Sequence, residues 1–383
     1  MTRRPPTPIP ALVQQKPLRR GWTTGTCATA AAKAAYAALL GGAFPDPVEV
    51  RLPRGERVAF ALAETARGPD SATAGVVKDA GDDPDVTHGA LIRAIVRLGP
   101  PGSGVTFRAG EGVGTVTRPG LVLPPGEPAI NPMPRQMIRA AVAEVASVHC
   151  ASGDAIVEVA IPGGEALARQ TLNGRLGIVG GLSVLGTTGI VVPYSCAAWI
   201  DSIQRGIDVA RAIGLAHVAG ATGRASEDAV RALHGLPEEA LIEMGDFVGA
   251  MLKYLRRRPV ARVTVAGGVA KMTKLAQGRL DLHAKRGAAD LAALAELARA
   301  RGASTETAER VLRANTVAEA FAASAEVPLG DAIAHAAWEV AAETLRPCET
   351  ELEIAVFDRA GALLGRAPFA PVHGTPPGLN RRR

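Results

Sequence analysis

The stretch "ARVTVAGGVAKMTKLAQG" (residues 261–278) places a short apolar run directly before two glycines and a helix-like segment. A run of this length, ended by glycine, predicts a buried strand that turns at once into a helix. "AHVAGATG" (216–223) has the same form and also precedes a helical segment. Strands that alternate with helices in this way favour a parallel, doubly wound α/β sheet.

The same rhythm extends over residues 169–345, where "LGIVGG" (176–181) and "GIVVP" (189–193) look like further strands. Residues 196–213 carry apolar side chains at helical spacing and charged ones between them, as in an amphipathic helix. In such sheets ligands bind beyond the carboxyl ends of the strands. That rule selects the loops 186–195, 220–226, 244–249 and 266–272.

The N-terminal half has a different pattern, with short β-like runs, glycine turns and few helices. We expect an α+β domain there, with helices over about 26–40 and from Pro134 to about 147. "ELEIAVFD" (351–358) reads as a late strand. The predicted organisation is an arm (1–17), an α+β domain (18–168), an α/β domain (169–345), a late strand packing on the body (346–371) and a flexible tail (372–383).

Composition narrows the class of protein. The 383 residues, 47% of them hydrophobic, suffice for two cores, and the net charge of +6 favours anionic partners. The short basic clusters lack interleaved aromatics, so a nucleic-acid partner is not favoured. Four distant cysteines, no secretion signal and no long apolar run indicate a cytoplasmic protein without a membrane span.

"RRGWTTGTCATAAAKAAYAALLGG" (19–42) puts threonines and a glycine at the start of an alanine-rich helix. Free N–H groups and a partial positive charge at a helix start attract carboxylates or phosphates, and the two arginines add full charges. Ordinary capping by threonine is the alternative. Cys27 is expected to be a packing residue, because no base that could activate it is evident.

"KDAGDDPDVTHGA" (78–90) crowds four aspartates and His88 into one loop. The cluster admits a metal site, although the spacing is not that of an EF-hand. Crowded carboxylates also shift one another's pKa values, which suits general acid–base chemistry. A solvated acidic turn is the third interpretation.

Three further stretches invite close ligand approach. Residues 110–135 form a stiff connection with Arg118, Asn131 and Arg135 as candidate anion contacts. Glycines recur over 177–195, but at spacings that fit neither a dinucleotide fingerprint nor a P-loop. In 266–284 a predicted helix start carries Lys271, while His283 is an acid–base candidate whose simpler role is structural.

Taken together, these stretches resemble the CbiD family of cobalamin biosynthesis, the cobalt-precorrin-5B C1-methyltransferases. The motifs "LRRGWTTGTCATAAAKAA", "KDAGDDPDVTHG", "GEGVGTVTRPGL", "AINPMPR", "RLGIVGGLSVLGTTGIVVPYS" and "GDFVG" occur here in the family's order. Two positions depart from the family pattern: Ala270 precedes Lys271, and His283 lacks hydroxyl neighbours. The second departure argues against a catalytic role for His283.

The resemblance implies a two-domain CbiD-like architecture, with an N-terminal α+β domain and a Rossmann-like doubly wound domain. It implies transfer of a methyl group from S-adenosylmethionine to C1 of cobalt-precorrin-5B, which gives cobalt-precorrin-6A. No protein-bound metal is expected, because the cobalt belongs to the substrate. The resemblance also allows for a homo-oligomer and for transient contact with neighbouring enzymes of the pathway.

Combined with the loops above, the resemblance assigns site residues to three roles. The acid–base residues expected are Asp82, Asp83, Asp85 and His88. The cofactor residues expected are Gly186, Thr187, Thr188, Gly189, Thr222, Gly223 and Asp246. The substrate residues expected are Arg20, Thr23, Thr24, Gly25, Thr26, Arg118, Asn131, Arg135 and Lys271. A corrinoid carrier without catalysis and a metal-dependent hydrolase using residues 79–88 are the alternatives.

Overall fold

The computed structural model describes residues 17–377, so most of the predicted arm and the end of the predicted tail lie outside the described residues. The chain divides into two compact units, each built from separate segments. The first unit contains residues 17–112, 130–163 and 184–195. The second unit contains residues 113–129, 164–183 and 196–377.

The first unit is built on a five-stranded sheet of order β4-β5-β6-β9-β7. Its strands are β4 (Glu64–Arg67), β5 (Ser71–Val77), β6 (Leu91–Leu98), β9 (Ala155–Ala160) and β7 (Val105–Ala109). Neighbours are antiparallel except β7 and β9, which run parallel. The unit therefore has the predicted mixture of short strands and few helices.

Helix α1 (Thr24–Gly41) lies on β5 and β6 and packs against α2 (Pro132–His149). Its alanines are almost all fully buried, since small side chains let a helix approach its neighbours closely on several sides. Both helices confirm the sequence prediction. The remaining strands of this unit form two pairs: β1 (Gly21–Trp22) with β11 (Ile190–Val191), and β2 (Val48–Arg51) with β3 (Arg57–Phe60).

The second unit is built on a five-stranded sheet of order β13-β12-β14-β15-β16. Its strands are β13 (Leu241–Glu243), β12 (His217–Ala221), β14 (Arg262–Gly268), β15 (Glu351–Phe357) and β16 (Leu363–Pro371). The first four are parallel, and β16 is antiparallel to β15. After β12 the chain adds β13 on one side of it and then β14 on the other side. The carboxyl ends of β12 and β14 therefore form a topological switch point.

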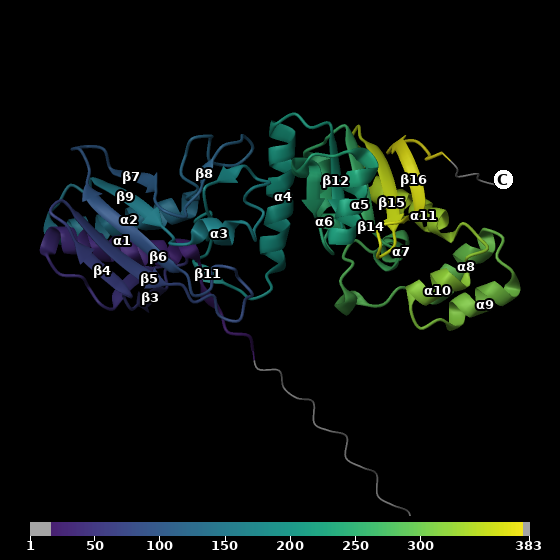
Figure 1. Cartoon of the computed structure of the whole chain (residues 1–383), viewed down its shortest axis with the longest axis horizontal. Helices are drawn as coiled ribbons and strands as arrows, with labels where there is room; N and C mark the ends of the chain where they lie inside the picture. Colours follow the sequence, from purple (N-terminus) through teal and green to yellow (C-terminus); the bar gives the residue numbers. More distant parts are fainter. Residues whose placement is uncertain (1–16, 378–383) are drawn as a thin grey trace, which may run out of the picture. The chain divides into compact units, whose positions relative to one another are not determined.

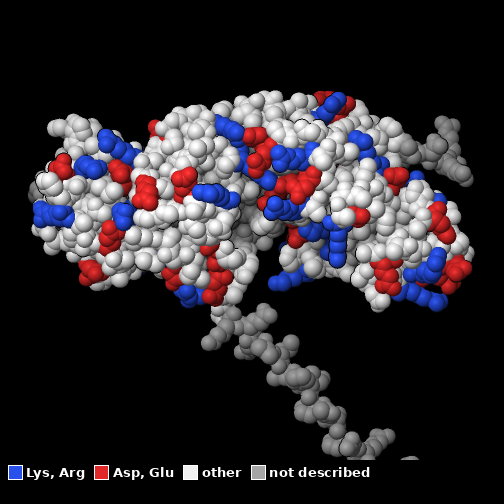
Figure 2. All heavy atoms as spheres, viewed as in Figure 1, with Lys and Arg blue, Asp and Glu red and all other residues white. Residues whose placement is uncertain are grey.

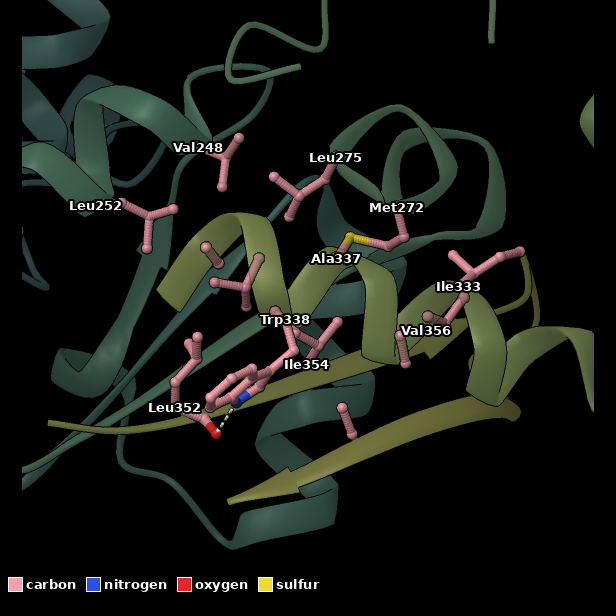
Figure 3. Packing of buried hydrophobic residues seen from close by; sticks show 14 of the residues in the cluster. Val248, Leu252, Met272, Leu275, Ile333, Ala337, Trp338, Leu352, Ile354 and Val356 are labelled. Carbon is pink, nitrogen blue, oxygen red and sulfur yellow. Dashed lines mark hydrogen bonds between the residues drawn. The ribbon is translucent and has the colours of Figure 1, made fainter. Parts of the chain in front are cut away.

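Helices cover both faces of this sheet (Figure 1). One face packs against α4 (Cys196–Ala212), α6 (Val248–Arg257), α7 (Val269–Ala276) and α11 (Leu329–Leu345). The other face packs against α5 (Arg224–His234). Trp338 of α11 fills the larger core and donates its indole N–H to the Leu352 carbonyl oxygen at 2.8 Å (Figure 3).

The other elements of the second unit are short. They are β8 (Thr115–Val116), α3 (Gly164–Ala168), β10 (Ile178–Val179), η1 (Glu238–Ala240), η2 (Ala284–Arg286), α8 (Leu291–Ala300), α9 (Thr305–Arg313) and α10 (Val317–Ala323). No helix within residues 17–377 is long and apolar enough to cross a membrane. On the face shown in Figure 2, basic side chains lie among acidic ones and form no continuous stripe.

The structure corrects several sequence predictions of organisation. "LGIVGG" and "GIVVP" contribute only two-residue strands outside the parallel sheet, where β10 pairs with β8 and β11 pairs with β1. Residues 346–371 do not pack on the body as one strand, because β15 and β16 are members of the main sheet. The tail begins as ordered structure, since Val372 is fully buried and donates its N–H to the Thr350 carbonyl.

A buried polar cluster lies between α5 and the sheet of the second unit. The Glu353 carboxylate, with no exposed surface, bonds His234 and Thr264 at 2.6 and 2.8 Å. His217 Nε2 lies 2.9 Å from the Thr264 hydroxyl. Burial lowers the pKa of His217 from 6.5 to about 4, and the His234 ring adds to this shift.

This shift predicts an acid sensitivity of the second unit. Between pH 6.5 and 4 the unfolded chain binds a proton at His217 that the folded chain does not, so the unfolding free energy falls as pH falls. Because the ring is partly exposed, solvent screening reduces this effect, and the loss between pH 7 and pH 5 is on the order of 1 kcal/mol. Urea unfolding of wild type and His217→Gln at both pH values measures it, because glutamine does not titrate. An equal loss in the variant would contradict this assignment.

Candidate functional site

The start of α1 is closed over by the glycine loop 185–189 of the first unit. Thr23 and Gly25 donate their N–H groups to the carbonyls of Gly189 and Leu185 at 3.1 and 2.8 Å. The Thr26 hydroxyl donates to the Gly189 carbonyl at 2.8 Å, and the Thr26 N–H is capped by the Thr23 hydroxyl at 3.2 Å. The N–H groups of Gly25 and Thr26, which the prediction reserved for a ligand, are therefore bonded within the protein.

Two glycines make this closure sterically possible. A Cβ on Gly25 would lie 2.6 Å from Pro134 Cγ, at the start of α2. A Cβ on Gly186 would lie 2.2 Å from the Thr23 hydroxyl oxygen. Thr23, Thr24 and Thr26 are buried, whereas Thr187 is exposed and Thr188 is half-buried. The two Thr-Thr-Gly motifs thus bind each other.

The acidic loop 78–90 packs beside the same junction. Trp22 donates its N–H to the Asp79 carbonyl at 2.7 Å, and the Arg19 guanidinium bonds both oxygens of the Asp79 carboxylate. These bonds from Arg19 lower the pKa of Asp79 to about 2, so this carboxylate is ionised at neutral pH. Asp82 accepts the Arg19 backbone N–H at 2.6 Å.

A fully buried lysine braces the loop from inside. The Lys78 ammonium bonds the Asp85 carboxylate and the Thr87 hydroxyl, and its side chain is 1% exposed. Burial alone would raise the pKa of Asp85, but the charge and hydrogen bonds of Lys78 and Thr87 hold it below the ordinary value. The Thr87 N–H and hydroxyl also donate to Asp85 Oδ1 at 2.7 and 2.6 Å.

His88 and Asp83 lie on the outer side of the loop. His88 Nδ1 accepts the Ala80 N–H at 3.1 Å, and half of its side chain is exposed. A ring that accepts at Nδ1 carries its proton on Nε2 when neutral, so His88 presents a donor. Asp83 Oδ1 accepts the Tyr194 N–H at 2.8 Å.

The four predicted acid–base residues therefore differ in what their side chains contact. Asp82, Asp83 and Asp85 each accept backbone or side-chain N–H and O–H groups of the protein, and His88 alone offers a ring nitrogen toward solvent. Within residues 17–377 no group of three or more His, Cys, Asp or Glu side chains could hold a metal ion. This arrangement gives the metal-dependent hydrolase alternative no ready ligand set.

The predicted substrate residues of the 110–135 stretch separate between the units. Arg118 lies in the second unit, where it pairs with Glu239 at 2.6 Å. Asn131 and Arg135 lie in the first unit at the start of α2. The Asn131 N–H reaches the Val184 carbonyl at 3.1 Å, and Arg135 donates to the Ile130 carbonyl at 2.7 Å. Arg20 is exposed.

The switch point of the second unit gathers the other predicted residues. Thr222 and Gly223 follow β12, Asp246 follows β13, and Lys271 lies in the first turn of α7. The Lys271 ammonium donates to the Thr222 carbonyl at 2.8 Å and lies 3.1 Å from Asp246 Oδ1. Lys271, predicted to bind substrate, thus lies among the predicted cofactor residues.

Two helix starts without a side-chain cap lie beside this cluster. Gly223 and Gly268 are the N-cap residues of α5 and α7, and neither helix start has a side-chain cap. A Cβ added to either glycine would meet nothing within 4 Å. The first N–H groups of a helix lack partners inside the helix, so these starts suit an anionic or hydroxyl-bearing ligand.

The predicted cofactor set is consequently split. Gly186 to Gly189 belong to the first unit, where they close over α1, and Thr222, Gly223 and Asp246 belong to the second. Cys27 is a packing residue as predicted, because burial raises the pKa of its thiol to about 12. His283 is exposed and caps η2 by accepting the Lys285 N–H at 3.1 Å, which is a structural task.

Lys78 was not among the residues predicted from the sequence. Its signal was the alternation of β5, in which Ala72, Ala74 and Val76 are buried, so that Lys78 continues the inward face. An inward lysine next to an acidic loop predicts an internal ion pair, because a buried charge requires a partner.

Comparison with known proteins gives matches over both ends of the chain. The model of the CbiD family matches residues 11–193, and that of the CbiD C-terminal domain matches residues 281–368. Cobalt-precorrin-5B C(1)-methyltransferase of Agrobacterium fabrum is 62% identical over 94% of this chain and 96% of its own length. The protein of the same name from Halorhodospira halophila is 63% identical over 92% of this chain and 95% of its own length.

A crystal structure of the cobalamin biosynthesis protein cbiD from Archaeoglobus fulgidus is also similar. The two chains are 28% identical, and the match has a TM-score of 0.38. It covers 66% of this chain and 77% of the Archaeoglobus protein. The sequence matches therefore carry the assignment to a family.

The Lys78 ion pair yields a stability prediction. Lys78→Met leaves the Asp85 carboxylate half-buried without its cation and should lower the unfolding free energy by about 3 kcal/mol. Arg57→Met removes a cation whose ion pairs are about half exposed and should cost less than about 1 kcal/mol. Urea unfolding at pH 7 compares the two. Equal losses would show that the Lys78 pair does not brace the loop.

Proposed function

The chain belongs to the CbiD family, and from this premise we propose that it methylates C1 of cobalt-precorrin-5B in cobalamin biosynthesis. The methyl donor is S-adenosylmethionine. The observation that carries the proposal is the match to methyltransferases of that name over almost the full length of both chains.

S-adenosylmethionine binds at the switch point of the second unit, as in Rossmann-like sheets. Its carboxylate meets the free N–H groups at the starts of α5 and α7 and the charge of Lys271. Asp246 accepts hydrogen bonds from ribose hydroxyls or from the ammonium group of the ligand. Gly223 and Gly268 leave the space that close approach to their backbone requires.

The corrinoid binds to the first unit near the junction of β1, the 78–90 loop and the start of α2. Its many carboxylates need cations and N–H donors, and Arg20, Arg135 and His88 Nε2 are side chains of the required chemistry. Thr23 to Thr26 and Gly186 to Gly189 act indirectly, by fixing the backbone that carries these donors.

The chemistry asks little of the protein beyond position. The bond between sulfur and the methyl carbon breaks as the bond to C1 forms, and sulfur keeps the electron pair and loses its positive charge. The corrinoid gains that charge and releases a proton. His88, which presents an N–H, suits donation to a substrate carboxylate better than removal of that proton.

A corrinoid carrier without catalysis is the alternative, and no contact in the structure favours it. Pure protein incubated with labelled S-adenosylmethionine and cobalt-precorrin-5B separates the two. The enzyme places label in the corrinoid, whereas a carrier binds the corrinoid tightly and leaves it unlabelled.

The proposed donor site predicts the effect of losing Lys271. Lys271→Met should weaken binding of S-adenosylhomocysteine about tenfold, because one charge-assisted bond is lost. Lys271→Arg keeps the charge and should bind more tightly than Lys271→Met. Lys274→Met is the matched control on α7, since Lys274 donates to the Leu282 carbonyl. Calorimetric titration measures all three, and equal affinities would remove Lys271 from the site.

The proposed substrate site predicts the effect of losing the His88 donor. His88→Phe should raise the KM for cobalt-precorrin-5B about tenfold, with kcat and the binding of S-adenosylhomocysteine little changed, because one hydrogen bond to a substrate carboxylate is lost. Val148→Ala, at a 77% exposed position of α2, is the control and should keep the wild-type KM. Initial rates with labelled donor give the comparison. A wild-type KM for the corrinoid in His88→Phe would contradict this contact and leave His88 a structural role.

A further inference from the structure

Tyr194 has an unusual backbone. Its φ is +56°, and within residues 17–377 Cys150 is the other non-glycine residue with positive φ. Cys150 ends α2 as a left-handed cap, with its N–H bonded to the Ala146 carbonyl, so its conformation has a structural explanation. Tyr194 caps no helix C-terminus. A tyrosine held in this region marks a site where the surrounding structure imposes the conformation.

The imposed conformation has identifiable causes. Asp83 Oδ1 accepts the Tyr194 N–H at 2.8 Å. The adjacent Asp82 is fixed to Arg19 by reciprocal bonds of 2.6 and 2.9 Å. On the chain side, Val191 of β11 pairs with Gly21 of β1. The backbone of residue 194 is therefore held by the acidic loop and by the β1–β11 pair together.

The result is an aromatic ring presented to solvent. Tyr194 is 68% exposed in a chain with only 3% aromatic residues, and Val192 beside it is 49% exposed. Arg20, next to Gly21, is exposed and forms no ion pair within residues 17–377. Arg19, which precedes Arg20, and Tyr194 donate their backbone N–H groups to Asp82 and Asp83, so the backbones at Arg20 and Tyr194 are anchored to the same turn.

We propose that the Tyr194 ring is a stacking surface for the face of the cobalt-corrinoid macrocycle, with Arg20 taking one of its carboxylates. Asp83 is a positioning residue that acts through Tyr194. The inference rests on the proposed function, since it takes its ligand from there. Planar conjugated ligands stack on aromatic rings, and a ring fixed in advance loses little freedom on binding.

The test is titration of the full chain with cobalt-precorrin-5B, followed by the corrinoid absorbance. Tyr194→Gly removes the ring, and glycine adopts positive φ without strain, so the variant stays folded. It should raise the corrinoid Kd about tenfold, whereas Tyr194→Phe should stay within about twofold. Val148→Ala, at a 77% exposed position of α2, is the control and should bind as wild type.

The role of Asp83 is tested in the same titration. Asp83→Ala should weaken corrinoid binding when it is introduced into the wild-type chain. It should have no additional effect in a chain that already carries Tyr194→Gly, because Asp83 acts only by positioning the Tyr194 ring. Wild-type affinity of Tyr194→Gly would overturn the proposal. So would an unchanged titration accompanied by altered sedimentation, which would assign the ring to contact with a second copy of the chain.

Failure of the proposed function gives a different result. If wild type binds the corrinoid but transfers no labelled methyl group, methylation is refuted and the titrations still decide the role of Tyr194. If wild type does not bind the corrinoid at all, both proposals fall.

Discussion

The first unit depends on the contact between the start of α1 and a loop that lies far along the chain. The Thr26 hydroxyl reaches the carbonyl of Gly189, 163 residues away in sequence. The backbone N–H groups of Thr23 and Gly25 bond the same loop, and the Thr26 N–H bonds the Thr23 hydroxyl, so these N–H groups have partners within the protein. The contact joins β1 to β11, and it sets the base on which the acidic loop and Tyr194 are arranged.

This contact changes the meaning of the Thr-Thr-Gly motifs. From the sequence, each motif predicts a helix start or a glycine turn that could bind an anion. Seen in the structure, each provides what the other needs, namely donors from Thr23 and Thr26 and the Gly189 carbonyl. The open helix starts are those of α5 and α7 in the second unit, where glycine caps leave the N–H groups free. The donor site is therefore proposed there.

Periodicity predicted the elements of the second unit well, because buried strands such as "ARVTVAGG" and amphipathic helices have patterns fixed by burial alone. It failed for "GIVVP" and for residues 113–129, whose places depend on pairing with distant segments. Three of the residues predicted to bind ligand, Thr222, Asp246 and Lys271, contact one another. The sequence placed Lys271 in another group, because it does not show which strand ends are neighbours. It did not single out Lys78 or Tyr194, because the burial of the first and the positive φ of the second arise only in the folded chain.

The central claim is that the methyl donor occupies the second unit at the carboxyl ends of β12, β13 and β14. Amide hydrogen exchange of the full chain with and without S-adenosylhomocysteine tests it directly. We expect slower exchange in residues 222–226, 244–249 and 268–272. Residues 185–189 should exchange as before, because their contacts to α1 are already made. Protection of residues 185–189, with none at the carboxyl ends of the sheet, would contradict it.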